Sequence, residues 1–391
     1  MTLSRGRAWL VAVVATLAMS VSYVDRQVVS AIGASVRRAL DVDAEHFGWL
    51  AGAFSASYLV VAPLAGLAID RIGARRGLVV AIAAWSLVSA SNALAPSFAV
   101  LLVLRVLLGA AEAPSFPAAA QSVQRALPPG DRSAAFGLLF TGSSFGAAVA
   151  GPLAIALDVH FGWRVAFVVT SVLGTAWVPS WLWVTRSPEV RAMLSGPAPG
   201  TAARSPARPA PSAAPLLREP AVLRAVLLVL ASAPALMFMY IWLPQYFELG
   251  RHVAKAAVAH YVWLPPVMAD AGMVGFGLLA SWRDRRSTHL RSHVGLVLVA
   301  AALETAMVLV PRAPGPWSAI VAVGVSAMGG GGLYTLLTAD MMARVSPSRI
   351  AAAGGMTAAA QSLIYVVLNP IVGRMIDRAH SFDGPLVMLG A

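Results

Sequence analysis

The stretch from Phe98 to Pro114 reads FAVLLVLRVLLGAAEAP, and its two charges are the strongest clue to the fold. Arg105 and Glu112 stand inside an apolar run, and Asp25 and Arg26 likewise interrupt the run from Trp9 to Ile32. A charge at the centre of a membrane helix costs roughly 2.5–3.5 kcal/mol on insertion scales and usually faces a bundle interior or a wet cavity. The matched signs predict that the two pairs compensate each other. A chain that keeps four such charges is expected to move a polar solute.

The composition indicates a membrane protein. Of the 391 residues, 58% are hydrophobic and only 12% are charged, whereas soluble domains average about 25% charged residues. Because a membrane helix needs about 20 mostly apolar residues, we predict eleven spans, which begin near Ala8, Phe47, Gly77, Phe98, Ser133, Trp163, Leu223, Ala257, Val294, Trp317 and Arg349. A twelfth begins near Pro385 and stops at Ala391, which is too short to cross a bilayer.

These spans predict an all-α membrane protein of two six-helix bundles with pseudo-two-fold symmetry and an incomplete twelfth helix. Residues 1–186 form the N-terminal bundle, residues 187–220 a cytoplasmic linker rich in Pro, Ala and Ser, and residues 221–391 the C-terminal bundle. A weak echo relates the halves, since the segment 66–70 matches 280–284 and Gly151-Pro152 matches Asn369-Pro370. Such duplication is expected of transporters that rock two bundles around a site at the midplane.

The net charge of +12 reflects topology rather than a nucleic-acid partner. Most of the 29 Lys and Arg residues lie at the N-terminus or in alternate loops, and this asymmetry places the N-terminus in the cytoplasm. The first segment is too long for a cleavable signal, and the use of Arg and Ala over Lys indicates a GC-rich bacterial genome. We therefore expect a monomer in the bacterial inner membrane. With no Cys and no metal-ligand spacing among the seven His, we expect no disulfide, metal or cofactor.

Helix geometry sharpens the interpretation of the charged pairs. Arg105 and Glu112 are two helical turns apart, so both point the same way at a separation of about 10 Å, with Gly109 on the same face. Pro114 then disturbs the helix just past Glu112, as does Pro117. Asp25 and Arg26 are adjacent and diverge by about 100°, so each must find a partner elsewhere. A purely structural ion pair that locks two helices together is the alternative interpretation.

Several motifs resemble those of a transporter family. The segment GLAIDRIGARR at 66–76 resembles the loop between helices two and three of the major facilitator superfamily. YVDR at 23–26 and RVLLGAAEAP at 105–114 resemble motifs of its anion:cation symporter family. Three further segments resemble the hexuronate, or sugar-acid, branch of that family: WLPQY at 242–246, WLPPVMADAG at 263–272 and LFTGSSFG at 139–146.

The resemblance implies a role for each matched residue. Arg26 is expected to bind a substrate carboxylate, while Asp25 and Glu112 carry protons. The full set of expected substrate-binding residues is Arg26, Arg105, Tyr23, Tyr58, Ser143, Tyr240, Gln245 and Gln361. A conformational latch is expected from Asp70, Arg71, Arg75 and Arg76. Relatives carry Asn in a Gly-rich helix eleven where this chain has Gln361 after three alanines, so the identity of the anion stays open. Asp270, Glu304 and Asp340 are expected to be structural or near helix ends.

The implied function is proton-coupled uptake of an organic anion, such as a hexuronate or an aldonate, by alternating access. Two Arg and two ionised acids leave the empty site neutral, so an added anion favours proton uptake, and by reciprocity a proton favours the anion. Proton-antiport efflux of an organic anion or a drug is the alternative, although Gly142, Gly146 and Gly151-Pro152 fit the antiporter signature only in part. An enzyme is disfavoured, since the chain has no His-Glu-x-x-His motif.

Overall fold

The computed structural model of the chain describes residues 3–195, 218–285, 293–345 and 350–390, which are helical with short connections and contain no β-strand. Residues 196–217 of the predicted linker and Arg349 of the last predicted full span lie outside the described residues. The chain divides into two compact units. The first comprises Met1–Val42 and Ala53–Ser205, and the second comprises Asp43–Gly52 and Pro206–Ala391.

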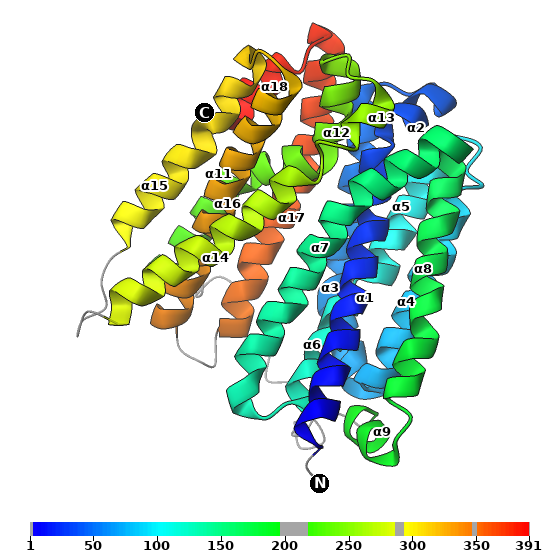
Figure 1. Cartoon of the computed structure of the whole chain (residues 1–391), viewed down its shortest axis with the longest axis vertical. Coiled ribbons are helices and arrows are strands. Elements are labelled where there is room, and N and C mark those ends of the chain that lie inside the picture. Colours follow the sequence, from blue (N-terminus) through cyan, green and yellow to red (C-terminus); the bar gives the residue numbers. More distant parts are fainter. Residues whose placement is uncertain (1–2, 196–217, 286–292, 346–349, 391) are drawn as a thin grey trace. The chain divides into compact units, whose positions relative to one another are not determined.

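The helices of the first half form the first unit, apart from the beginning of α3 (Figure 1). They are α1 (Arg5–Ala31), α2 (Gly33–Leu40), α3 (Ala44–Ile72), α4 (Ala74–Asn92), α5 (Phe98–Glu112), α6 (Ser115–Ala126), α7 (Pro129–Phe161), α8 (Trp163–Val184) and α9 (Pro188–Leu194). The predicted disturbance after Glu112 is confirmed, because α5 ends there and α6 begins at Ser115. Pro114 lies in the break, where its missing amide hydrogen cannot continue the helical hydrogen bonds.

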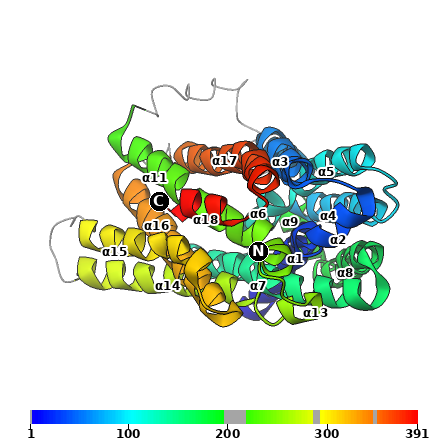
Figure 2. The ribbon, with the colours of Figure 1, turned by 90° about the horizontal axis from the view of Figure 1, so that it is seen from above.

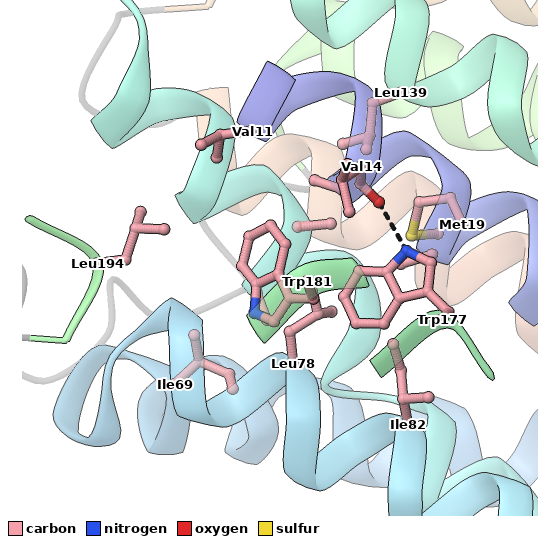
Figure 3. Packing of buried hydrophobic residues seen from close by; sticks show 14 of the residues in the cluster. Val11, Val14, Met19, Ile69, Leu78, Ile82, Leu139, Trp177, Trp181 and Leu194 are labelled. Carbon is pink, nitrogen blue, oxygen red and sulfur yellow. Dashed lines mark hydrogen bonds between the residues drawn. The ribbon is translucent and has the colours of Figure 1, made fainter. Parts of the chain in front are cut away.

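Two tryptophans of α8 form the centre of the first unit's core (Figure 3). Trp177 and Trp181 stack with ring centroids 5.4 Å apart, and the Trp177 indole donates a hydrogen bond of 2.8 Å to the backbone oxygen of Val14 in α1. The bond satisfies a polar group that would otherwise be buried without a partner. Val190 and Leu194 of α9 join the same core. The first residues after position 187 therefore form a helix that packs on the first unit, where the sequence predicts linker.

The second unit contains the helices of the second half of the chain. They are α11 (Pro220–Met237), the π-helix η1 (Phe238–Trp242), α12 (Leu243–Gln245), the π-helix η2 (Tyr246–Gly250), α13 (Lys255–Val258), α14 (Leu264–Arg285), α15 (Val294–Glu304), the 3₁₀-helix η3 (Thr305–Arg312), α16 (Pro316–Arg344), α17 (Ile350–Ala379) and α18 (Asp383–Gly390). Figure 2 shows α14 and α15 beside α16, against which both pack. The echo residue Asn369 accepts a hydrogen bond of 2.9 Å from the Trp242 indole and so ties α17 to η1.

The beginning of α3 belongs to the second unit because α17 holds it. The Asp377 carboxylate accepts hydrogen bonds from the backbone amides of Ala44 at 2.9 Å and Glu45 at 2.7 Å. A carboxylate at a helix N-terminus satisfies free amides and complements the helix dipole. Arg374, one turn earlier in α17, forms two hydrogen bonds with the Glu45 carboxylate, at 2.9 and 2.5 Å. This contact joins residues more than 300 positions apart, and the sequence analysis did not anticipate it.

The all-α membrane architecture is confirmed. Ten helical segments of the described residues are long and apolar enough to cross a membrane, where consecutive helices such as α5 and α6 count as one segment. The chain is a multi-pass membrane protein. The additional predicted span near Gly77 corresponds to α4, which is more polar and buries Ser86, Ser89 and Asn92. The short twelfth helix is α18, which packs against η3 and α17 and buries Leu386 and Leu389.

Close packing of α1 on α7 generates a first testable prediction. A Cβ atom at Gly146 would lie 2.2 Å from the backbone oxygen of Ser20, whereas a Cβ atom at Gly137 on the same helix meets nothing within 4 Å. Gly146→Ala should therefore destabilise the protein by about 1–3 kcal/mol through overpacking. Gly137→Ala should leave stability unchanged or raise it slightly, because Ala favours a helix over Gly. Thermal unfolding of the two purified variants in one detergent makes the comparison, and equal midpoints would contradict the packing.

Candidate functional site

The four intramembrane charges form one cluster inside the first unit. Asp25 and Arg26 come from α1, and Arg105 and Glu112 come from α5. Asp25, Arg105 and Glu112 are almost completely buried, whereas the Arg26 side chain keeps 22% of its surface exposed. Arg26 is therefore the member of the cluster that a solute can reach most readily.

Two side chains on one face of α1 donate hydrogen bonds to the Glu112 carboxylate. The Arg26 Nε atom donates to Glu112 Oε2 at 3.3 Å, and the Ser22 hydroxyl donates to Glu112 Oε1. Ser22 and Arg26 are four residues apart, so a single helix face presents both donors to α5. This pair links two membrane helices through a buried charge. As expected from helix geometry, Arg26 does not pair with its neighbour Asp25 but finds its partner on another helix.

Asp25 faces a different set of helices. Its Oδ1 atom accepts hydrogen bonds from the hydroxyls of Ser89 in α4 and Thr170 in α8, the latter at 3.1 Å. Its Oδ2 atom is buried and has no hydrogen-bond partner among the described residues. The two acids thus occupy different environments: Glu112 has a cation beside it, and Asp25 has two neutral hydroxyl donors.

Aromatic rings surround the two arginines. The Arg26 guanidinium carbon lies 4.7 Å from the ring centre of Tyr23 and 5.0 Å from those of Phe54 and Tyr58. The Arg105 guanidinium carbon lies 4.9 Å from the centre of the same Phe54 ring. Rings at these distances attract a cation through their quadrupoles. Tyr23 and Tyr58, both expected from the sequence to bind substrate, are thereby placed beside Arg26.

Gly109 allows this arrangement. A Cβ atom there would lie 2.4 Å from the backbone oxygen of Phe54, so only Gly lets α3 approach α5 closely enough for Phe54 to lie beside both arginines. Arg105 itself is buried, and its Nε and Nη1 atoms have no hydrogen-bond partner among the described residues. Unsatisfied guanidinium donors in a buried cluster are suited to bind an anion or ordered water.

The remaining expected site residues are distributed over both units. Ser143 is buried in α7 of the first unit. In the second unit, Tyr240 lies in the π-helix η1, Gln245 is fully buried in α12 and Gln361 is partly exposed on α17. π-helical turns inside α-helices occur frequently at functional sites. The segment from Gly142 to Gly146 also spells Gly-x-Ser-x-Gly, but it lies within α7 and lacks the strand-to-helix turn that this hydrolase motif requires.

Two of the expected latch residues, Asp70 and Arg75, form hydrogen bonds within the first unit. The Gln121 amide of α6 donates to Asp70 Oδ1 at 2.8 Å, and Arg75 Nε donates to Thr185 Oγ1 at 3.0 Å. Arg71 and Arg76 are exposed. Asp340, expected to be structural, pairs with Arg344 at 2.6 Å and Arg224 at 3.2 Å near the end of α16.

Sequence reasoning missed the hydroxyl partners of the two acids. The position of Ser22 could have been recognised from the sequence, because it lies one turn before Arg26 on the same face of an apolar helix. Nothing in the sequence indicated that Ser89 and Thr170 would contact Asp25. They come from α4 and α8, and a small hydroxyl residue in a membrane helix commonly bonds its own backbone, as Thr170 also does to Ala166.

Acids and arginines buried together inside membrane-spanning helices are typical of polytopic transporters, and this chain has both features. Comparison with known proteins places the chain within this class. The model of the Major Facilitator Superfamily matches residues 10–369, and the chain belongs to that superfamily. It is accordingly a membrane transporter rather than an enzyme.

Among curated relatives, the chain is similar to the hexuronate transporter of Bacillus subtilis (strain 168), with 26% identity over 383 residues that cover 96% of this chain and 89% of the relative. The hexuronate transporter of Escherichia coli (strain K12) is also 26% identical, over 95% of this chain and 88% of its own length. The galacturonate transporter of Dickeya chrysanthemi is 27% identical, over 69% of this chain and 80% of its own length.

Solved structures show the same fold. A bacterial homologue of the human lysosomal transporter Spinster, in an inward-facing and unoccupied conformation, matches with a TM-score of 0.80 and 20% identity over 96% of this chain and 84% of its own. A D-xylose-proton symporter matches with a TM-score of 0.74 and 13% identity over 98% of this chain and 95% of its own.

The buried pair between Arg26 and Glu112 generates the second prediction. Arg26→Met leaves Glu112 in a buried site without its cation and should cost about 3–5 kcal/mol, while Arg26→Met combined with Glu112→Met should restore part of that loss. The surface pair of Arg5 and Asp131, 3.0 Å apart, is the control. The coupling energy of that pair should be about 0.2–1 kcal/mol. Double-mutant cycles of unfolding free energy measure both, and equal coupling energies would show that the buried pair is not a structural link.

Proposed function

We propose that this transporter takes up a sugar acid, such as a hexuronate or an aldonate, together with protons by alternating access. The names of the relatives support the substrate class, since two that are similar along nearly their whole length are hexuronate transporters. The observation that carries the proposal is the partly exposed Arg26 paired with the buried Glu112. We further propose a monomer in the bacterial inner membrane, with the N-terminus and the segment 187–220 in the cytoplasm.

Arg26 is the proposed anchor of the substrate carboxylate. Its planar guanidinium can grip a carboxylate with two parallel hydrogen bonds. The adjacent hydroxyls of Tyr23 and Tyr58 supply donors and acceptors for sugar hydroxyls. Arg105 contributes positive charge and unsatisfied donors to the same cluster. Ser143 is a further proposed binding residue of the first unit. In the second unit, Tyr240, Gln245 and Gln361 are the proposed binding residues.

Competition for Arg26 couples the anion to a proton. Arg26 donates a hydrogen bond to Glu112, so a substrate carboxylate that binds Arg26 must take the place of the Glu112 carboxylate. Glu112 would then be a buried charge without its cation, which costs several kcal/mol unless the carboxyl takes up a proton. The protonated carboxyl keeps its contact with the Ser22 oxygen. By linkage, a proton on Glu112 raises the affinity for the anion by the same factor as the bound anion raises the affinity of Glu112 for the proton.

Asp25 is the proposed second proton carrier. Its Oδ1 atom accepts two hydroxyl hydrogen bonds. Its Oδ2 atom is buried, has no hydrogen-bond partner among the described residues and can therefore bind a proton. Asp70, Arg71, Arg75 and Arg76 are the proposed latch, which would tie α3 and α4 to their neighbours in one state of the cycle and release them in another. Proton-antiport efflux is the second candidate function, and the direction of pH-driven flux in proteoliposomes separates it from uptake.

The anchor role predicts a defect in Arg26→Lys. Lys keeps the charge but loses the two-pronged hydrogen bonding, so the affinity for the sugar acid should fall by at least about tenfold, equivalent to about 1.4 kcal/mol. Equilibrium binding of galacturonate, glucuronate and an aldonate to the purified variants measures it, with Arg38→Lys on α2 as an exposed control. If Arg26→Lys binds normally and Arg105→Lys does not, Arg105 is the anchor.

The coupling role predicts that Glu112→Gln separates exchange from accumulation. Gln imitates the protonated acid, so the loaded carrier should still reorient and exchange labelled substrate. It should fail to concentrate substrate on a proton gradient, because the proton it imitates is never released. Counterflow and pH-driven uptake in the same vesicles give both readouts, and Asp25→Asn should behave similarly. Accumulation by Glu112→Gln at the wild-type rate would assign Glu112 to structure alone.

A further inference from the structure

A third acid within a membrane span, Glu304, is partly buried and belongs to the second unit. Glu304 is the last residue of α15, at the point where the α-helix passes into the 3₁₀-helix η3. The span from Val294 to Arg312 is otherwise apolar, apart from Arg312 at its end. The 3₁₀-helix occupies the second half of this span and ends with it at Arg312.

The Glu304 carboxyl points at the glycine run of α16. A Cβ atom at Gly330 would lie 3.3 Å from Glu304 Oε1 and 3.4 Å from a side-chain carbon of Leu236 in α11, so the carboxyl and this leucine meet over the bare backbone of Gly330. One turn along, the Ser326 hydroxyl donates to the Glu304 backbone oxygen at 2.8 Å. The backbones are equally close at Gly329, where a Cβ atom would lie 2.5 Å from the Glu304 amide nitrogen.

No charged group compensates this carboxyl. Oε1 is buried and has no hydrogen-bond partner, and Glu304 enters no ion pair among the described residues. The described contacts bring Ser326, Gly329 and Gly330 of α16 and Leu236 of α11 close to Glu304, and none of these residues titrates. The contrast with the first unit is direct, since Glu112 has Arg26 and Ser22, and Asp25 has Ser89 and Thr170.

We infer that Glu304 is a proton-binding site of the second unit, and that the bound proton lets α15 lie against the glycine face of α16. An ionised carboxylate in this span would need water or a cation beside it, whereas the contacts around Oε1 are with the Gly330 backbone and the Leu236 side chain. The neutral carboxyl needs neither. The site belongs to helix packing and is separate from the coupling proposed for Asp25 and Glu112.

Infrared spectroscopy of the full chain in liposomes at neutral pH tests the inference. The spectrum of wild type minus Glu304→Gln should contain the carbonyl stretch of a protonated carboxyl, and this band should shift when D₂O replaces water. Gln has nearly the same size and is neutral, so the variant should fold and still accumulate substrate on a proton gradient. Glu189→Gln is the matched control, because Glu189 is exposed and paired with Arg7 at 3.5 Å, and its difference spectrum should contain only carboxylate bands.

Two further variants separate this site from the others. The Glu304 band should persist in the Asp25→Asn, Glu112→Gln double variant. In Gly330→Ala the new methyl group would press on Oε1, so the band should move in frequency even with Glu304 in place. A carboxylate band that disappears in Glu304→Gln would overturn the inference. So would a protonated-carboxyl band that is lost in the double variant and retained in Glu304→Gln.

Discussion

The cost of holding charge inside a membrane span constrains the whole first unit. The Arg26 guanidinium and the Glu112 carboxylate, 3.3 Å apart, are tolerable there only as partners. The contact fixes the facing sides of α1 and α5, and it brings the aromatic rings of Tyr23, Phe54 and Tyr58 around Arg26. The close approach at Gly109 and the helix break at Pro114 both adjoin this pair. The same pair is the feature that an anionic substrate would have to disrupt, which connects the stability of the unit to its proposed function.

The three acids within the spans illustrate how surroundings set the chemistry of one functional group. Glu112 lies beside a cation, Asp25 beside two hydroxyls, and Glu304 over bare glycine backbone with no described partner for Oε1. In a poorly hydrated interior these differences in surroundings affect how readily each acid binds or releases a proton. A cation that can change partners makes the first acid suited to coupling, whereas the last has no such partner and is suited to packing.

Contacts across the chain assign the beginning of α3 to the second unit. Asp377 caps the helix, Arg374 pairs with Glu45, and Phe47 packs edge-on against Trp242 with ring centres 5.5 Å apart. Charge-assisted hydrogen bonds to helix amides are stronger than neutral ones, and the aromatic contact adds to them. These interactions differ in kind from the apolar packing of the first unit's core around Trp177 and Trp181.

The sequence by itself determined the membrane class, the helical spans, the break after Glu112 and the divergence of Asp25 from Arg26. Each of these follows from local hydrophobicity, proline chemistry or the 3.6-residue period, and none needs a distant partner. Tertiary structure alone decided that Ser89 and Thr170 hold Asp25, that residues 188–194 fold as a helix on the first unit, and that Glu304 lies over Gly330. Asp25 and Thr170, for example, are 145 positions apart. No local pattern specifies these contacts, because the same serine, threonine or glycine in a membrane helix serves equally well for ordinary packing.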